Sequence, residues 1–370
     1  METSSSAHPH VFVVEIAGAG GICHYTYNLL QSFGNSLSVT LYTGCPYELE
    51  HFERAFAVEC TFRRFKTNPL RVIDLYLNAL RKRPMAVHFQ LSQFPSLVLA
   101  LIILFRIIGI RIVTTAHNVI SHESRGWSPW IFGTIYRLSH RIIVHSQHSK
   151  DELKDMLRLP PQKIAVIDHG NYMFFDDDDG ANVGADGIFR ILFFGYIRKY
   201  KGLSVLLESL HLLAQDQHQF TLEIVGKPQE PFAPYQQQIE RYGLAARIEV
   251  RLDYIPLAEV KRYFQRASVV VLPYLNISQS GVLQLAYAFG KPVVVTRTGG
   301  LPEVVEDGRT GFVVPPGDSR ALALALRTLM HAPELLQDMG NRATELAETR
   351  FSWGHIAELN QALYFGGAAA

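Results

Sequence analysis

The sequence predicts an α/β fold of two domains, each built around a parallel sheet, with a ligand cleft between them. The chain of 370 residues is long enough for two domains of ordinary size. Short apolar runs typical of buried strands alternate with amphipathic helical patterns, and a polar, glycine-bearing stretch at 176–187 divides them into two series. Strand–helix–strand units build parallel sheets, and such domains bind ligands at the carboxyl ends of their strands.

The first series covers residues 1–175. Its expected strands are 11–16, 38–43, 86–89, 111–115 and 141–144, and a helix at 24–33 follows the first strand. An apolar run at 96–105 meets Arg106 and Arg111 before it reaches the roughly 20 residues that span a bilayer. We expect a buried helix there, with attachment to a membrane surface as the alternative.

The second series covers residues 188–350, and a further helix is expected within 351–370. The expected strands are 190–194, 221–225, 248–251, 269–272 and 292–295. The expected helices are 203–213, 236–242, 257–265, 282–289, 321–330, 333–349 and 352–364. We expect residues 176–187 to form a linker or solvated loop rather than a metal site, because adjacent aspartate side chains point apart.

The residue composition and the distribution of charge indicate which kinds of partner the protein can bind. Hydrophobic residues make up 48% and charged residues 19%, which is typical of folded proteins, and a net charge of +1 does not favour nucleic acid. Residues 1–165 hold 17 Lys/Arg against 11 Asp/Glu and the remainder 18 against 23, so the two parts carry +6 and −5. A basic first part suits an anionic partner or membrane surface.

Cysteine usage and the first residues bear on the compartment. The three cysteines form no C-x-x-C pair, which fits a reducing environment and argues against a disulfide framework or a zinc site. The opening METSSSAHPH lacks the basic and apolar regions of a signal peptide. We therefore expect a cytoplasmic protein.

A glycine turn follows the first expected strand. Gly18, Gly20 and Gly21 do not match the dinucleotide fingerprint, because its third glycine falls at Cys23 and no acidic residue lies near position 40. A Gly-Gly pair lets a ligand approach the backbone closely, although a tight turn alone selects the same residues. The turn therefore predicts either a ligand contact or local geometry only.

Basic residues follow the first strand of the second series. Arg198, Lys199 and Lys201 lie between this strand and the next helix, where the helix macrodipole disfavours ordinary cations. Such residues can hold a diphosphate. We expect at least two of the three to do so, the alternative being a solvated basic turn.

Histidines follow several expected strands. His117 comes after 111–115, with His122 five residues further on, and His145 and His169 end similar apolar runs. A histidine at a strand end can donate to a substrate hydroxyl or a leaving oxygen. The spacing and the lack of a third ligand argue against a metal. A helix cap or a hydrogen-bonded buried imidazole is the alternative.

A second candidate turn leads from the expected strand 269–272 to the expected helix 282–289. Residues 276–281 are small and polar and precede a helix, so their backbone N–H groups can bind an anion such as a phosphate. Glu303 follows Gly299 and Gly300, where it is either a helix N-terminal acid or a residue of the cleft.

Taken together, these segments resemble a family 4 retaining glycosyltransferase (glycosyltransferase group 1) with the GT-B fold of two Rossmann-like domains. The resemblance covers nearly the whole chain and is carried by GGI at 20–22, TTAHN at 114–118, IIVHSQHSKDEL at 142–153, IAVIDHGNY at 164–172, FGYIRKYKGLSVLLESL at 194–210, LEIVGK at 222–227, VVVLPY at 269–274, GKPVVVTRTGGLPEVVEDGRTGFVVPPGD at 290–318 and the closing FSW…LY. In this fold the last helix crosses back to the first domain.

The chain departs from the family pattern at the donor site. Many members carry two glutamates eight residues apart, and Ile277 and Leu285 occupy those positions here. The sequence SQSGV resembles a subgroup in which residues 280–282 line the phosphate through hydroxyl and backbone groups. The family's first clamp arginine corresponds to Tyr196.

The resemblance implies transfer of a hexose from a UDP- or GDP-sugar, without a cofactor or a metal. The implied catalytic residues are His117, Arg198 and Lys201. The implied donor-binding residues are Gly20, Gly21, Arg251, Tyr254, Ser278, Gln279, Ser280, Gly281, Val282 and Glu303. The implied acceptor-binding residues are His122 and His145. The leaving phosphate accepts the acceptor's proton in a front-face displacement that needs no enzymic nucleophile.

The acceptor is expected to be a glycan or a polyprenyl-diphosphate-linked lipid, as in exopolysaccharide synthesis. The basic region 71–83 and the apolar run 96–105 suggest that the protein meets it on the inner face of a membrane. Two alternatives stay open: a GT-B epimerase or phosphorylase, and a non-catalytic protein that binds a nucleotide sugar.

Overall fold

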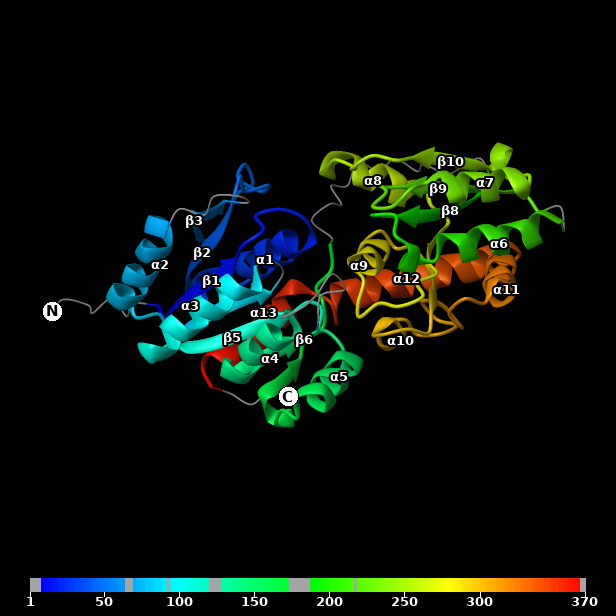
Figure 1. The fold of residues 1–370 in the computed structure, drawn as a ribbon. Coiled ribbons are helices and arrows are strands. Elements are labelled where there is room, and N and C mark those ends of the chain that lie inside the picture. Colours follow the sequence, from blue (N-terminus) through cyan, green and yellow to red (C-terminus); the bar gives the residue numbers. More distant parts are fainter. Residues whose placement is uncertain are drawn as a thin grey trace. The chain divides into compact units, whose positions relative to one another are not determined.

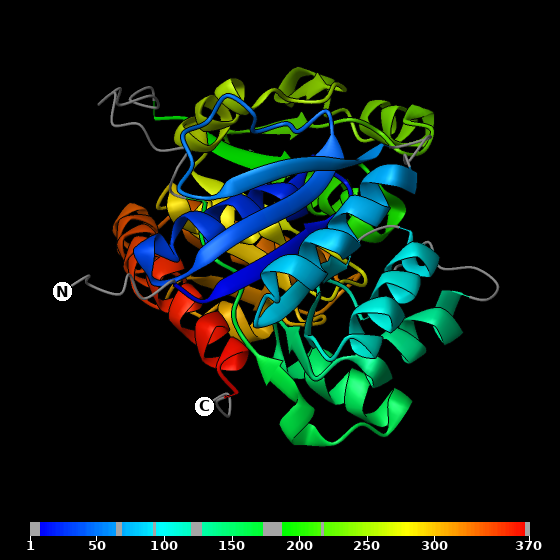
Figure 2. The same cartoon turned by 90° about the vertical axis from the view of Figure 1, so that its left-hand side faces the viewer.

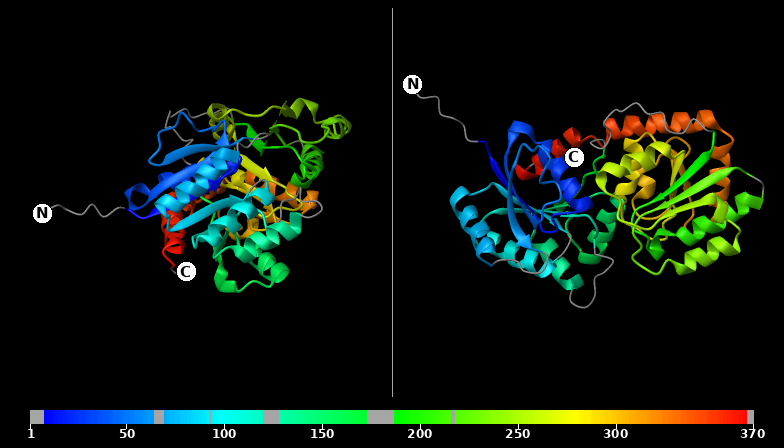
Figure 3. Two further views of the ribbon diagram at one scale, coloured as in Figure 1. Left: turned by 60° about the vertical axis from the view of Figure 1, so that its left-hand side comes forward. Right: turned by 90° about the horizontal axis from the view of Figure 1, so that it is seen from above.

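The computed structural model describes residues 8–63, 69–91, 94–119, 128–172, 187–215 and 218–366. Contacts divide the chain into two compact units, one of Met1–Gly170 with Ser352–Ala370 and the other of Asn171–Phe351 (Figure 1). Each unit is a parallel sheet covered by helices on both faces (Figure 3). The predicted fold class, α/β with two Rossmann-like domains, is confirmed.

The sheet of the first unit has seven strands in the order β3-β2-β1-β4-β5-β6-β7. They are β1 (His10–Glu15), β2 (Ser38–Cys45), β3 (Ala57–Arg63), β4 (Ala86–Leu91), β5 (Arg111–Ala116), β6 (Arg141–Val144) and β7 (Ile164–Val166). The central strands read as continuous apolar runs because helices cover both of their faces. The direction of strand addition reverses between β1 and β4.

Six α-helices of the described residues belong to the first unit. They are α1 (Gly21–Gln31), α2 (Pro69–Lys82), α3 (Pro95–Ile107), α4 (Ser128–Leu138), α5 (Gln147–Leu157) and α13 (Trp353–Tyr364). Helices α1 and α13 pack together on one face of the sheet, while α2, α3 and α4 lie along the other (Figures 1 and 2). The last helix is held in place by a 2.6 Å hydrogen bond between the Tyr364 hydroxyl and His88 Nδ1 on β4.

The sheet of the second unit has six strands in the order β10-β9-β8-β11-β12-β13. They are β8 (Phe189–Phe194), β9 (Phe220–Val225), β10 (Ile248–Arg251), β11 (Val269–Leu272), β12 (Val293–Thr296) and β13 (Gly311–Val314). Its helices are α6 (Leu203–Gln215), α7 (Ala233–Arg241), α8 (Leu257–Arg266), α9 (Gly281–Ala288), α10 (Leu301–Val304), α11 (Ser319–Met330) and α12 (Pro333–Glu348).

Successive residues of β11, a central strand of the second unit, pack into two different hydrophobic cores. Val269 and Val271 pack with α6 and α11, whereas Val270 and Leu272 pack with α8 and α9. This division explains why the strand is apolar at every position, since both of its faces are buried.

Several expected elements differ in extent. The first helix begins at Gly21 rather than near residue 24, and β12 begins at Val293, after Pro292. Strands β3 and β13 were not expected from the sequence, and β7 was indicated only as the apolar run before His169. Of the expected linker at 176–187, only Gly187 falls within the described residues.

The prediction that the apolar run is buried is only half right. Helix α3 buries Leu101 and Phe105 but exposes Ile103, Leu104 and Ile107. Among the described residues no helix has the length and apolarity needed to cross a membrane.

Candidate functional site

In both units polar residues gather beyond the carboxyl ends of the strands, at the point where the strand order reverses. The reversal lies between β1 and β4 in the first unit and between β8 and β11 in the second. Ligands of open α/β sheets bind at such points, because the loops on either side diverge there.

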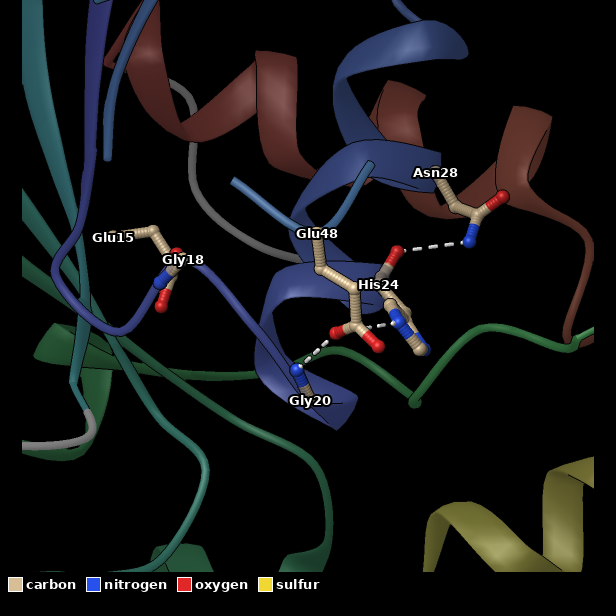
Figure 4. A network of polar contacts seen from close by, with 6 residues as sticks. All are labelled: Glu15, Gly18, Gly20, His24, Asn28 and Glu48. Carbon is tan, nitrogen blue, oxygen red and sulfur yellow. Dashed lines mark hydrogen bonds and ion pairs between the residues drawn. The ribbon is translucent and has the colours of Figure 1, made fainter. Parts of the chain in front are cut away.

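The glycine turn of the first unit is shaped by a buried carboxylate. Glu15, the last residue of β1, accepts hydrogen bonds from the N–H groups of Ala17 and Gly18 at 2.8 Å each and from Thr43 Oγ1 at 2.9 Å. Figure 4 shows Glu15 beside Gly18. Burial raises the pKa of Glu15, while these donors oppose the rise. The turn therefore owes its form to a residue inside the sheet.

A second carboxylate, that of Glu48, contacts the same turn at Gly20. Gly20 N–H donates to Glu48 Oε2 at 2.7 Å, and His24 Nε2 lies 3.3 Å from the same oxygen (Figure 4). The Glu48 N–H donates in turn to the Gly18 carbonyl at 2.8 Å. Helix α1 starts at Gly21, so the carboxylate stabilises the positive end of its macrodipole. Gly20 has φ +81°, and a Cβ there would meet no atom within 4 Å.

A row of histidines follows β5, β6 and β7. His117 Nε2 lies 2.8 Å from Gln90 Oε1, and its Nδ1 lies 3.1 Å from His145 Nε2. His145 Nδ1 donates to the Ile167 carbonyl at 2.9 Å, which fixes the ring. The structure thus brings together His117 and His145, two of the residues expected from the sequence. His122 lies outside the described residues.

These histidines surround one aromatic side chain. The ring centroid of Tyr25 on α1 lies 4.8 Å from that of His117, 5.2 Å from His145, 5.0 Å from His169 and 5.1 Å from Trp353. Burial is the main cause that lowers the pKa of His145 to about 4 and that of His169 to about 3, and it lowers the pKa of His117 as well. At neutral pH the cluster is therefore uncharged. Among the described residues no group of three His, Cys, Asp or Glu side chains is arranged to hold a metal ion.

The cluster of the second unit centres on Lys201. This residue ends a short 3₁₀ helix after β8 and is only 7% exposed. Burial first, and then the charge of Arg198, lowers the pKa of Lys201 to about 8. Its Nζ lies 5.6 Å from the ring centroid of Tyr274, and a Cβ at Gly195 (φ +97°) would come within 2.9 Å of it. A side chain at 195 would therefore displace the ammonium group.

The 276–281 turn reaches the same place. Ser280 Oγ lies 3.3 Å from the Tyr274 hydroxyl, and the site of a Cβ on Gly195 is 3.6 Å from Val282. Helix α9 starts at Gly281, where a Cβ would lie 3.1 Å from the hydroxyl of Tyr172. A buried ammonium, two hydroxyl groups and a helix N-terminus thus meet at the strand reversal, an arrangement that suits an anion.

The remaining predicted residues lie around this cluster at the carboxyl edge of the sheet. The Ser278 carbonyl accepts from Gly300 N–H at 2.9 Å, which joins the two turns expected to contact the donor. Glu303 follows on α10 and is partly buried. Gln279 is partly buried, and its Oε1 has no partner among the described residues.

The side chain of Arg251 is bound by residues of α8. It forms an ion pair with Glu259 and a 2.7 Å hydrogen bond to the Tyr263 hydroxyl, both on α8. Tyr254 is exposed. The guanidinium group of Arg251, a predicted donor-binding residue, is thus held by α8.

Sequence reasoning missed residues that reach the clusters from elsewhere in the chain. They are Tyr25, Glu48, Gln90, Tyr172, Tyr274 and Trp353. Tyr274 had a local signal, since it directly follows an apolar strand. Glu48 had none, because its partner Gly20 is 28 residues away.

Two family models match the chain over most of its length. Residues 19–170 match the model of Glycosyltransferase Family 4, and residues 188–332 match that of Glycosyl transferases group 1. The chain carries two glycosyltransferase domains. The glycine turn and the histidine cluster lie in the family 4 domain, and Lys201 with the 276–281 turn lies in the group 1 domain.

Known proteins resemble parts or all of these domains. The D-inositol 3-phosphate glycosyltransferase of Corynebacterium glutamicum (strain R) is 34% identical over 179 residues, 47% of this chain and 42% of that protein. The GDP-mannose:glycolipid 4-beta-D-mannosyltransferase of Xanthomonas campestris pv. campestris is 30% identical over 218 residues, 58% of each. The chain spans about half the length of the curated relatives it matches.

A solved structure extends the likeness to both domains. The crystal structure of Anabaena HepE in complex with UDP aligns with 96% of this chain and 100% of that one, with a TM-score of 0.77 and 20% identity. The two domains therefore have the GT-B fold.

Proposed function

We propose that the protein is a retaining hexosyltransferase that moves a sugar from a UDP- or GDP-sugar to a glycan or lipid-linked acceptor. The observation that carries the proposal is Lys201, a buried cation beside Tyr274 and Ser280 at the strand reversal of the group 1 domain. Burying a lysine without a paired acid is costly, which favours a role with an anionic ligand. A nucleotide diphosphate supplies that anion.

In the proposed reaction the protein acts mainly through charge. Lys201 and Arg198 stabilise the departing diphosphate, together with Ser280 and the N-terminus of α9. The leaving phosphate takes the proton of the acceptor hydroxyl, so no side chain becomes a covalent nucleophile. Preorganised donors of this kind are worth about 3–4 kcal/mol each in other enzymes. The two cations carry the charge that a metal ion carries in other transferases.

We assign the acceptor to the family 4 domain. His117 is neutral and both of its ring nitrogens are engaged, Nδ1 by His145 and Nε2 by Gln90, so a sugar hydroxyl would take the place of Gln90 at Nε2. The name of the Xanthomonas relative, which acts on a glycolipid, supports a lipid-linked acceptor. We extend this to a polyprenyl-diphosphate carrier of exopolysaccharide synthesis, met by a cytoplasmic protein at the inner face of the membrane.

The proposal is tested by incubating the protein with a panel of UDP- and GDP-sugars, with and without membrane extract, and identifying the products by mass spectrometry and anomeric NMR. We expect one donor to be consumed and its sugar to appear on the acceptor with the anomeric configuration retained. Inversion at the anomeric carbon, or no binding of any nucleotide sugar, would refute it.

Two other functions give different results in the same experiment. A GT-B epimerase interconverts donors without any acceptor, and a phosphorylase needs inorganic phosphate. A non-catalytic binding protein holds the donor without consuming it. The buried Ile277 and Leu285 at the positions of the family's glutamates favour this last alternative over the first two.

A further inference from the structure

Helix α2 of the family 4 domain is apolar on two opposite sides. Leu75 and Ala79 are fully buried against the sheet. Leu70, Ile73, Leu77 and Leu80 recur at three- and four-residue spacings and are exposed, Leu70 by 66%. Residues at such spacings form one stripe along a helix, and this stripe faces away from the core. Because these side chains are not buried, packing of the core does not explain why the stripe is apolar.

The neighbouring helix α3 also exposes a row of apolar side chains. Helix α3 contacts α2 on the same face of the sheet (Figure 2). It buries Val98, Leu101 and Phe105 and exposes Ile103, Leu104 and Ile107, the last by 73%. Soluble proteins rarely expose large apolar patches that have no binding role.

The charge beside these rows is strongly positive. Helix α2 ends in Arg81 and Lys82, Arg83 follows directly, and all three are exposed. On α2 and α3 Asp74 is the single acidic residue, and Arg71 and Arg106 add further positive charge. A second copy of this face would place like charges against one another, whereas an anionic surface would complement it.

We propose that α2 and α3 dock the family 4 domain on an anionic lipid bilayer, with Leu70, Ile73, Leu77 and Leu80 entering the interface. An amphipathic helix with a basic flank binds such membranes through buried apolar area and headgroup charge. The inference rests on the proposed function in one respect: it identifies the surface that brings the enzyme to a lipid-linked acceptor.

The test is co-sedimentation of the whole protein with vesicles. We expect binding to phosphatidylcholine and phosphatidylglycerol in equal parts, weaker binding at high salt, and little binding to phosphatidylcholine alone. Because each basic residue near the surface contributes about fivefold, Arg81→Glu with Lys82→Glu should weaken binding at least about tenfold. Ile73→Asp with Leu77→Asp should do the same.

Matched controls carry the same changes elsewhere. Leu324, which is 54% exposed on α11, and the exposed Arg320 give Leu324→Asp and Arg320→Glu, which should bind vesicles as the unaltered protein does. Circular dichroism melting shows whether each variant is folded. Wild-type failure to bind anionic vesicles, or equal binding by folded α2 variants, overturns the proposal.

Two further measurements separate the possible errors. If Ile73→Asp with Leu77→Asp converts a dimer to a monomer in sedimentation equilibrium without changing vesicle binding, the stripe is a contact between copies and the proposal is wrong. Nucleotide-sugar binding in solution is measured on the same variants and should be unchanged. If no variant binds a nucleotide sugar but vesicle binding behaves as expected, the proposed function fails and the docking surface stands.

Discussion

His145 Nε2 lies 3.1 Å from His117 Nδ1, inside the family 4 domain and away from water. The Ile167 carbonyl accepts from the other nitrogen of His145, so rotation of either ring would break a hydrogen bond. His145 thus acts as a positioning residue for His117. The pair, with the nearby His88 and His169, also links the stability of the domain to pH.

Lowering the pH below about 6.5 should decrease the free energy of unfolding of the family 4 domain. The pKa values of His145 (about 4), His88 and His169 (about 3 each) lie below the usual 6.5, chiefly because of burial. The unfolded chain therefore binds protons between pH 6.5 and 4 that the folded domain does not. Stability is complete above pH 6.5 and falls as pH drops, by about 1–2 kcal/mol per buried histidine at pH 5.

Urea unfolding at pH 7.5, 6 and 5 measures this loss. His169→Gln should reduce the slope of stability against pH, since one titrating group is removed. His211→Gln, at a half-buried histidine on α6 of the other unit, is the matched control and should leave the slope of the first unit as it is. A slope that does not respond to His169→Gln contradicts the assignment.

Removal of the buried ammonium should affect turnover more than stability. Lys201→Ala should lower kcat about 10²–10³-fold, the range seen on loss of one preorganised donor. Its stability should change little, because desolvation of the charged group is relieved. Lys199→Ala, two residues away and exposed, is the matched control and should stay active. Equal activity of the two variants would remove Lys201 from the site.

Donor affinity should fall at alkaline pH. With its pKa lowered to about 8, Lys201 has lost half of its charge in the free protein at that pH and loses most of the rest above it. A bound diphosphate favours the charged form, so binding must take up a proton there. Calorimetric titration with UDP or GDP in two buffers of different ionisation enthalpy should detect proton uptake at pH 9 and little at pH 7. Lys201→Ala should abolish the difference.

Loss of the Glu48 carboxylate should destabilise the start of α1. Glu48→Ala removes the acceptor of Gly20 N–H and the partner of His24, and loss of such a cap costs about 1 kcal/mol. Glu50→Ala changes an exposed carboxylate two residues away and should cost far less. Thermal melts of both variants provide the comparison.

Chelation should leave the proposed transfer reaction unaffected. If Lys201 and Arg198 carry the charge of the leaving diphosphate, prolonged treatment with EDTA should not lower the rate. A rate that falls with EDTA and returns with Mg²⁺ or Mn²⁺ would show that a cation shares this role.

Strands with a strong local signal were predicted closely. The ranges of β6, β10 and β11 match the expected residues, because short apolar runs bounded by polar residues locate strands well. Strand β3 was missed because its residues AVECTFR lack a clear apolar period. Strand β7, which has three residues, was indicated by the apolar run before His169 but was given no range. β13 was missed because its run follows a glycine-rich turn that resembles a loop.

The candidate site could be predicted only in part, since its support comes from distant residues. Lys201 and Ser280 each follow an apolar strand, a local pattern that the sequence displays. Their shared neighbour Tyr274, and the engagement of Gly20 by Glu48, depend on how strands are ordered in space. A single sequence does not display that order.

The bond between Tyr364 and His88 joins the last helix to a central strand of the first unit. During synthesis the ribosome must therefore reach Tyr364 before this unit can close. The second unit, Asn171–Phe351, is one continuous segment and is synthesised before α13. We therefore expect the second unit to reach its native state before the first unit does.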